Sequence, residues 1–253
     1  MSGLPKPARR ALPAPQVRDF RALLDEALLA TDEQGRVWSA AQWGVYAFFD
    51  YDGEPIYVGQ TNEQLRVRVR RHLTNQRTDA VAMRILDVFE VAALELWPLW
   101  ELQDRPLADP AERRRAQGLL NATEHTAYLD AIGASRFGAI LNEKIPPRSE
   151  RVPLPPSRRF GLVSEQTLAE RGHPDVRIAR RAETISRLAA VAYERGEVSD
   201  GLRRVLVVQA VRLAYLAAER LAYVEGRPPP DPAAISIEKL VGSVLAEPDE
   251  RLY

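Results

Sequence analysis

The sequence predicts an α/β protein of the α+β type: a small three-stranded antiparallel sheet flanked by helices, followed by a C-terminal all-α domain. Two β-prone runs flank an Asp-Gly turn signal within residues 44–59, and residues 88–97 are rich in Val, Leu, Phe and Trp. Beyond a proline-rich linker, long stretches have helical apolar spacing. The predicted organisation is a tail with a bracing helix at 1–42, a first domain at 43–147 and a helical accessory domain at 157–253.

The predicted hairpin carries two tyrosines. An even number of loop residues places Tyr46 and Tyr57 on the same face, because side chains alternate along a strand and cross-strand partners share a face. Taken alone, this pattern favours aromatic packing against a core. The next segment is a predicted helix on which Arg68 and His72 lie four residues apart, at the edge of an apolar stripe. An Arg and a His beside two phenols indicate a polar site.

The same helix is strongly basic. Four further arginines give it local positive charge, against only Glu63 and Asp79. A solvated helix face is the ordinary interpretation of such a run. Beside two tyrosines we expect contact with nucleic-acid phosphates instead. The predicted nucleic-acid-binding residues are Arg66, Arg70, Arg71 and Arg77.

A helix predicted at about 111–132 carries Glu124 on a largely apolar stripe. A buried carboxylate needs a cation or hydrogen bonds, so Glu124 is either a metal ligand or part of a structural salt bridge. Glu112 and Asp130 are the alternative carboxylates. The other predicted helices span 16–30, 175–194, 199–225 and about 234–245, and the linker spans 148–156.

In their order along the chain, these residues resemble the GIY-YIG nuclease family over about 43–146. The signatures are Gly44-Val45-Tyr46 and Tyr57-Val58-Gly59, followed by Arg68 with His72, then Glu124, then Asn142. The resemblance implies a metal-dependent DNA endonuclease that hydrolyses phosphodiester bonds. Such enzymes serve restriction and phage defence or DNA repair. Arg66 competes with Arg68 for the family's arginine, and the spacing to His72 favours Arg68.

The resemblance also implies a role for each residue. Glu124 would hold Mg²⁺ (or Mn²⁺), and Arg68 would bind the scissile phosphate. Tyr46 would act as general base or pass its proton to His72, since a free tyrosine has a pKa of about 10. Tyr57 would contact the phosphate or the attacking water, and Asn142 would orient the site. A different class of function stays open: a catalytically inactive protein of this fold that binds nucleic acid or acts as a scaffold. A purely helical interaction protein is a further alternative.

The amino-acid composition narrows the possible classes of protein and of binding site. The chain has no cysteine, which excludes disulfides and thiolate zinc sites. Its 35 basic residues balance 35 acidic ones, so DNA binding must rest on local patches. No apolar run approaches the ~20 residues of a membrane span. We expect a cytoplasmic protein without a membrane partner.

The C-terminal half carries its own expectations. The apolar helix around 205–221 predicts a homodimer contact. Five arginines of this half are expected to face DNA: Arg177, Arg180, Arg181, Arg203 and Arg204. A chain that ends near Arg151 is expected to stay folded without this half.

Overall fold

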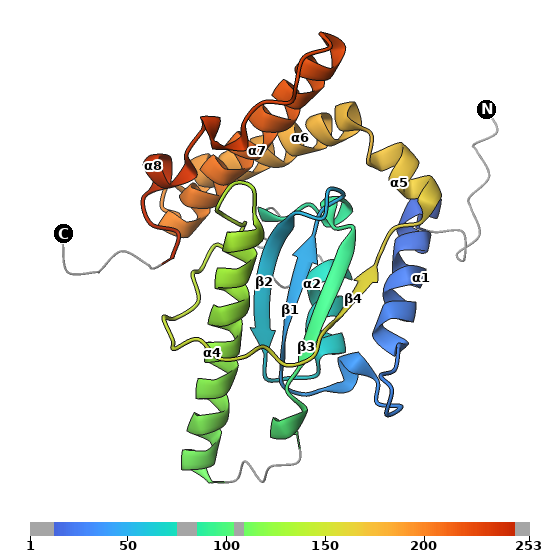
Figure 1. Cartoon of the computed structure of the whole chain (residues 1–253), viewed down its shortest axis with the longest axis vertical. Coiled ribbons are helices and arrows are strands. Elements are labelled where there is room, and N and C mark those ends of the chain that lie inside the picture. The colour runs from blue at the N-terminus through green and yellow to red at the C-terminus, as the bar shows by residue number, and fades with distance from the viewer. Residues whose placement is uncertain (1–12, 75–84, 104–108, 246–253) are drawn as a thin grey trace, which may run out of the picture.

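The fold is organised around one antiparallel sheet with the strand order β2-β1-β3-β4 (Figure 1). The computed structural model describes residues 13–74, 85–103 and 109–245. The strands are β1 (Gly44–Phe49), β2 (Pro55–Thr61), β3 (Ala93–Pro98) and β4 (Arg158–Gly161). β2 is therefore one edge of the sheet and β4 the other.

Helices surround this sheet. The α-helices are α1 (Pro15–Leu29), α2 (Leu65–Thr74), α4 (Pro110–Ala134), α5 (Glu165–Arg171), α6 (Pro174–Arg195), α7 (Asp200–Val224) and α8 (Ile237–Val241). Short 3-10 turns are η2 (Trp38–Ala40), η3 (Val88–Glu90), η4 (Trp100–Leu102) and η5 (Pro232–Ala234). Side chains cap most long helices at the N-terminus, as Asp109 does for α4 and Ser199 for α7. Over the described part of the chain, no helix is both long enough and apolar enough to cross a membrane.

The α+β class is confirmed, but the predicted count of three strands is wrong. The fourth strand, β4, pairs antiparallel with β3, with Leu94 opposite Phe160. It has four residues, and only Phe160 among them is buried. So short and polar a segment has no strand pattern of its own, and it lies after the linker, where we expected only helices. β3 also starts later than expected, because residues 88–90 form a 3-10 turn.

The hairpin has the predicted arrangement of tyrosines. Tyr46 lies opposite Gly59 and Phe48 opposite Tyr57, which puts both phenols on one face with ring centroids 6.2 Å apart. A register shift between Phe48 and Phe49 precedes the turn. Gly53 closes the turn with φ +72°, a conformation that glycine adopts without strain.

Each face of the sheet has its own core. Tyr46, Phe48 and Leu96 point to the face that α1 and α2 cover, through residues such as Leu24 and Leu65. Val45, Ala47, Val58 and Trp97 point to the opposite face, where α4 packs through Leu120, Ala127 and Tyr128. The first core continues into the C-terminal helices through Leu188, Leu202, Val205 and Val208. Both halves of the chain therefore share one core.

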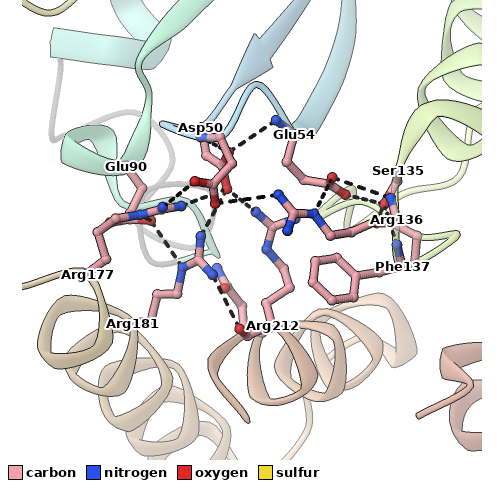
Figure 2. A network of polar contacts seen from close by, with 12 residues as sticks. Asp50, Glu54, Glu90, Ser135, Arg136, Phe137, Arg177, Arg181 and Arg212 are labelled. Carbon is pink, nitrogen blue, oxygen red and sulfur yellow. Dashed lines mark hydrogen bonds and ion pairs between the residues drawn. The ribbon is translucent and has the colours of Figure 1, made fainter. Parts of the chain in front are cut away.

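A buried ionic network joins the hairpin turn to the C-terminal helices (Figure 2). Asp50 Oδ2 accepts hydrogen bonds from three guanidinium groups: Arg212 at 2.8 Å, Arg181 at 2.9 Å and Arg177 at 3.2 Å. Arg181 Nε also donates to Glu90 at 3.1 Å. All five side chains are at least nine-tenths buried. A buried charge that loses its partner is strongly destabilising, so these contacts fix α6 and α7 against the sheet.

This network corrects one expectation for the C-terminal half and argues against another. Arg177 and Arg181 do not face DNA, because they are buried against Asp50 and Glu90. Arg180 is paired with Asp87, and Arg204 donates to the Glu143 carbonyl. A chain cut near Arg151 would lose β4, part of the core and all three arginine partners of Asp50, which argues against the expectation that it stays folded.

The apolar surface of α7 is mostly used inside the chain. Leu202, Val205, Val208, Val211 and Leu216 are all buried. The large apolar residues of α7 that stay clearly exposed lie at its C-terminal end: Leu221, Tyr223 and Val224. The surplus surface that led us to expect a homodimer is thus largely absent from the described residues of this helix.

Candidate active site

The candidate site is a cleft of about 490 Å³ at the outer edge of β2. Strand β2, helix α2, helix α4 and the segment after Ala139 each contribute side chains to it. Four of the six predicted catalytic residues line the cleft: Tyr57, Arg68, Glu124 and Asn142. Residues far apart in the sequence are therefore brought together at one place.

Tyr46 and His72 lie behind the cleft wall. The Tyr46 side chain has no exposed surface, and its hydroxyl is 3.1 Å from His72 Nδ1. Arg68 Nε donates to the same hydroxyl at 3.4 Å, so Arg68 connects Tyr46 to the cleft. The rings of Tyr57 and His72 meet edge to face, with centroids 4.9 Å apart. The predicted pairing of Arg68 and His72 on one face of α2 is thus present.

Gly59 makes this close packing of phenols possible. A Cβ atom at this position would lie 2.7 Å from the Tyr46 hydroxyl and 2.9 Å from the Tyr57 ring. Neither ring can retreat, since both are packed against Phe48. A glycine is required here because backbone and phenol come so close.

Burial keeps both phenols neutral. It raises the pKa of Tyr46, although the positive charge of Arg68 and hydrogen bonds from Arg68 and Tyr57 work in the opposite direction. Burial raises the pKa of Tyr57 further, and the hydrogen bond to Tyr46 adds to the increase. Of the two, Tyr46 is the better placed to lose a proton, because its oxygen receives the hydrogen bonds.

Glu124 is the buried carboxylate of the cleft. Its side chain is 8% exposed, and burial raises its pKa to about 7. The backbone N–H of Gln60 donates to it, and the charge of Arg68 also favours the ionised form. The two alternative carboxylates are placed differently. Glu112 pairs with Arg115 and Asp130 with Arg151, both on the surface, and neither lines the cleft.

Asn142 completes the edge of the sheet. Its Oδ1 accepts from the Val58 N–H at 3.0 Å, and its Nδ2 donates to the Val58 carbonyl at 2.7 Å. The N–H of Leu141 donates to the Ile56 carbonyl at 2.8 Å. These bonds satisfy the edge of β2 as a further strand would, and they hold the Tyr57-Val58-Gly59 signature in place.

The predicted nucleic-acid-binding arginines differ in their surroundings. Arg66 is exposed and bonds locally, to Gln64. Arg70 forms an ion pair with Asp25 on α1, and Arg71 forms one with Glu63. Arg77 lies outside the described residues. Part of the positive charge of α2 is therefore neutralised within the chain.

The cleft suits a divalent cation with few protein ligands. Mg²⁺ prefers oxygen ligands and is commonly held by one or two carboxylates together with water and substrate phosphates. Glu124 offers such a carboxylate. In the described residues no group of three or more His, Asp or Glu side chains gathers as a metal cage. The donor set fits a cation that shares its ligands with a phosphate.

Sequence reasoning missed three polar residues that line the cleft: Gln60, Glu143 and Lys144. Gln60 directly follows the second signature, and the other two directly follow Asn142. Adjacency to a signature was the only available signal. Glu143 is further tied to the N-terminus of α7 by a 2.6 Å hydrogen bond from Ser199.

Comparison with known proteins gives one finding. A family model described as the GIY-YIG catalytic domain matches residues 42–105. The match covers both signatures, α2 and β3, and ends before Glu124 and Asn142. It identifies this segment as a nuclease-type fold, whereas the C-terminal half has no family match. Neither curated proteins nor solved structures give a match to the chain.

Proposed function

Since residues 42–105 carry a GIY-YIG catalytic domain, we propose that the protein is a metal-dependent endonuclease that hydrolyses phosphodiester bonds of DNA. One observation carries the proposal. Tyr57, Arg68, Glu124 and Asn142 converge on one cleft, and Tyr46 and His72 stand directly behind it. Two of these residues lie outside the matched segment, so the geometry supports the proposal independently of the match.

Hydrolysis of a phosphodiester needs three things. A water molecule must lose a proton, the charge on the phosphate must be neutralised, and the leaving oxygen must be stabilised. A Mg²⁺ or Mn²⁺ ion at Glu124 would supply a Lewis acid that polarises the phosphate. Side chains of the protein would neutralise further charge on the phosphate and accept the proton from the water.

Arg68 is the proposed phosphate ligand. It is the arginine of α2 that lines the cleft, and a guanidinium binds phosphate oxygens through paired hydrogen bonds. Its Nε is directed at Tyr46, which holds the side chain in position. Developing negative charge in the transition state then meets a fixed positive charge.

The proton route runs through the phenols. Tyr57 lines the cleft, is hydrogen-bonded to Tyr46, and Tyr46 contacts His72 Nδ1. A proton from the attacking water passes along this series of hydrogen bonds while the new bond from oxygen to phosphorus forms. The bond to the leaving oxygen breaks at the same time; a cation held by Glu124 would stabilise the negative charge on that oxygen, which then takes a proton from solvent. Because burial keeps the phenols neutral, His72 is the proposed final acceptor, with Tyr46 as the relay.

Other features support DNA as the substrate. Arg66 is exposed on α2, and Lys144 is exposed at the cleft. The biological setting we propose is restriction or phage defence, or DNA repair, as the family resemblance suggests. The pairing of two chains stays a prediction without support from α7.

The proposal is tested by incubating the protein with supercoiled, linear and branched DNA, with Mg²⁺, with Mn²⁺ and with a chelator. We expect cleavage that depends on the metal, and mapped ends that show which bond breaks. The raised pKa values of both phenols favour one competing function, a catalytically inactive DNA-binding protein. Tight DNA binding without metal and without cleavage on any of these substrates would establish that alternative.

A further inference from the structure

Gln60 shares its location with Glu124. It follows Gly59 directly and lines the same cleft, and its backbone N–H donates to the Glu124 carboxylate. The side chain of Gln60 is half-buried. It therefore lies where a cation held by Glu124 would need further oxygen ligands.

The orientation of the Gln60 amide is set by α4. Its Nε2 donates to Asn121 Oδ1 at 3.0 Å, and the same oxygen accepts from Gln117 Nε2 at 2.8 Å. The Gln60 side chain also donates a hydrogen bond to the Glu124 carboxylate. The amide nitrogen is therefore held between Asn121 and Glu124, which fixes the orientation of the amide group. Asn121 precedes Glu124 by three residues, so both lie on the same side of the helix.

This orientation leaves the amide oxygen without a partner. Gln60 Oε1 is buried, and none of the described residues donates a hydrogen bond to it. A buried acceptor without a hydrogen bond destabilises the fold and calls for an explanation such as a bound ion or water. An amide carbonyl is a hard oxygen of the kind that Mg²⁺ and Mn²⁺ accept.

We propose that Gln60 Oε1 is a second protein oxygen in the coordination sphere of the divalent cation held by Glu124. The inference rests on the proposed function, which places the cation at Glu124. It explains why the buried acceptor is tolerated, and why two further amides on α4 hold the group. A neutral second ligand also leaves the cation more positive than a second carboxylate would.

The competing interpretation is structural. The bond from Gln60 to Asn121 also ties β2 to α4, and that tie alone would make Gln60 important for stability. Two substitutions separate the interpretations. Gln60→Leu removes both the donor and the acceptor, whereas Gln60→Glu keeps an acceptor oxygen and loses the donor.

The test measures Mn²⁺ affinity of the full chain by electron paramagnetic resonance at pH 8, with thermal unfolding in the absence of metal. We expect Gln60→Leu to weaken the affinity at least about tenfold and Gln60→Glu to preserve or tighten it. Gln64→Leu is the matched control, because Gln64 contacts Arg66 and does not line the cleft. It should bind Mn²⁺ as the unmodified protein does.

Glu124→Gln separates failure of the inference from failure of the proposed function. If this variant loses Mn²⁺ while Gln60→Leu binds it normally, Gln60 is not a ligand and the Glu124 site stands. Equal losses in both Gln60 variants, with a lower melting temperature, would assign Gln60 a structural role only. Normal Mn²⁺ binding by Glu124→Gln would show that Glu124 does not hold the cation, which contradicts the proposed metal site. If Gln60→Leu does not fold, the affinity of Gln60→Glu decides.

Discussion

The hydroxyl of Tyr46 lies 3.1 Å from His72 Nδ1, although the Tyr46 side chain has no contact with solvent. Tyr46 can therefore reach substrate only through its neighbours, Tyr57 and Arg68. This contact makes a proton relay the natural role for Tyr46, and it makes the phenolic oxygen, not the ring, the group to test.

Tyr46→Phe should abolish most cleavage while preserving the fold. The ring and its packing remain, so the free energy of unfolding should change by no more than about 1–2 kcal/mol. Loss of the relay should reduce the single-turnover rate by about 10²–10⁴. Tyr51→Phe is the matched control, because Tyr51 lies in the turn of the same hairpin, its hydroxyl donates to the Phe89 carbonyl in η3, and it does not line the cleft. Equal cleavage by Tyr46→Phe and the unmodified protein would show that Tyr46 only packs in the core and takes no part in proton transfer.

Arg68→Ala should slow cleavage far more than Arg66→Ala. Arg68 lines the cleft and contacts Tyr46, whereas Arg66 is exposed and bonds Gln64. Arg66→Ala should weaken DNA binding and reduce its salt dependence, because each phosphate contact releases counterions. Single-turnover rates at saturating DNA separate the rate from the affinity. Similar rate losses in both variants would contradict the assignment of Arg68.

Glu124→Gln should stabilise the metal-free protein at alkaline pH. The pKa of Glu124 is about 7 in the folded state, against 4.5 for an unperturbed glutamic acid side chain. The folded state therefore binds the Glu124 proton more tightly than the unfolded state does. The stability that this proton contributes to the fold is fully present below pH 4.5 and is lost as the pH rises to about 7. The loss amounts to about 3 kcal/mol. Urea unfolding in the presence of chelator should therefore show that the free energy of unfolding of the variant, relative to that of the unmodified protein, increases between about pH 5.5 and pH 8.

Asp130→Asn is the control for this pH effect. Asp130 is exposed and pairs with Arg151 at the surface, so its replacement should change stability by less than about 1 kcal/mol at both pH values. A stability difference for Glu124→Gln that does not vary with pH would mean that the carboxylate ionises normally in the fold.

Asp50→Ala should destabilise the whole chain in a single transition. The substitution leaves Arg177, Arg181 and Arg212 buried with too few partners, at a cost of about 3–5 kcal/mol. Asp175→Ala removes an exposed pair with Arg220 and should lower the stability far less than Asp50→Ala does. The measurement is urea unfolding followed by fluorescence and circular dichroism. Separate transitions for the sheet and the C-terminal helices would show that the network does not couple them.

The site was largely predictable because its signals are local. Strand alternation gives the shared face of Tyr46 and Tyr57, and helical spacing gives the pair Arg68 and His72. Glu124 stood out as a carboxylate on an apolar stripe. Each of these inferences needs only a few neighbouring residues.

The coupling of the two halves was not predictable, because its contacts join residues that are far apart in the sequence. Arg177 and Arg212 resemble ordinary surface arginines in the sequence, because their partner Asp50 lies 127 and 162 residues away. The strand β4 likewise forms only because β3, far earlier in the sequence, offers it an edge. Gln60 directly follows the second signature, but only the structure shows that it lines the cleft and which of its amide atoms has a partner.

The central claim is metal-dependent cleavage through Glu124, and the most direct measurement is plasmid cleavage by Glu124→Ala beside Asp130→Ala. Both substitutions remove a carboxylate from α4, but only Glu124 lines the cleft. With Mg²⁺, we predict that Asp130→Ala cuts as the unmodified protein does, and that Glu124→Ala binds DNA without cutting it. Full Mg²⁺-dependent cleavage by Glu124→Ala would contradict the account.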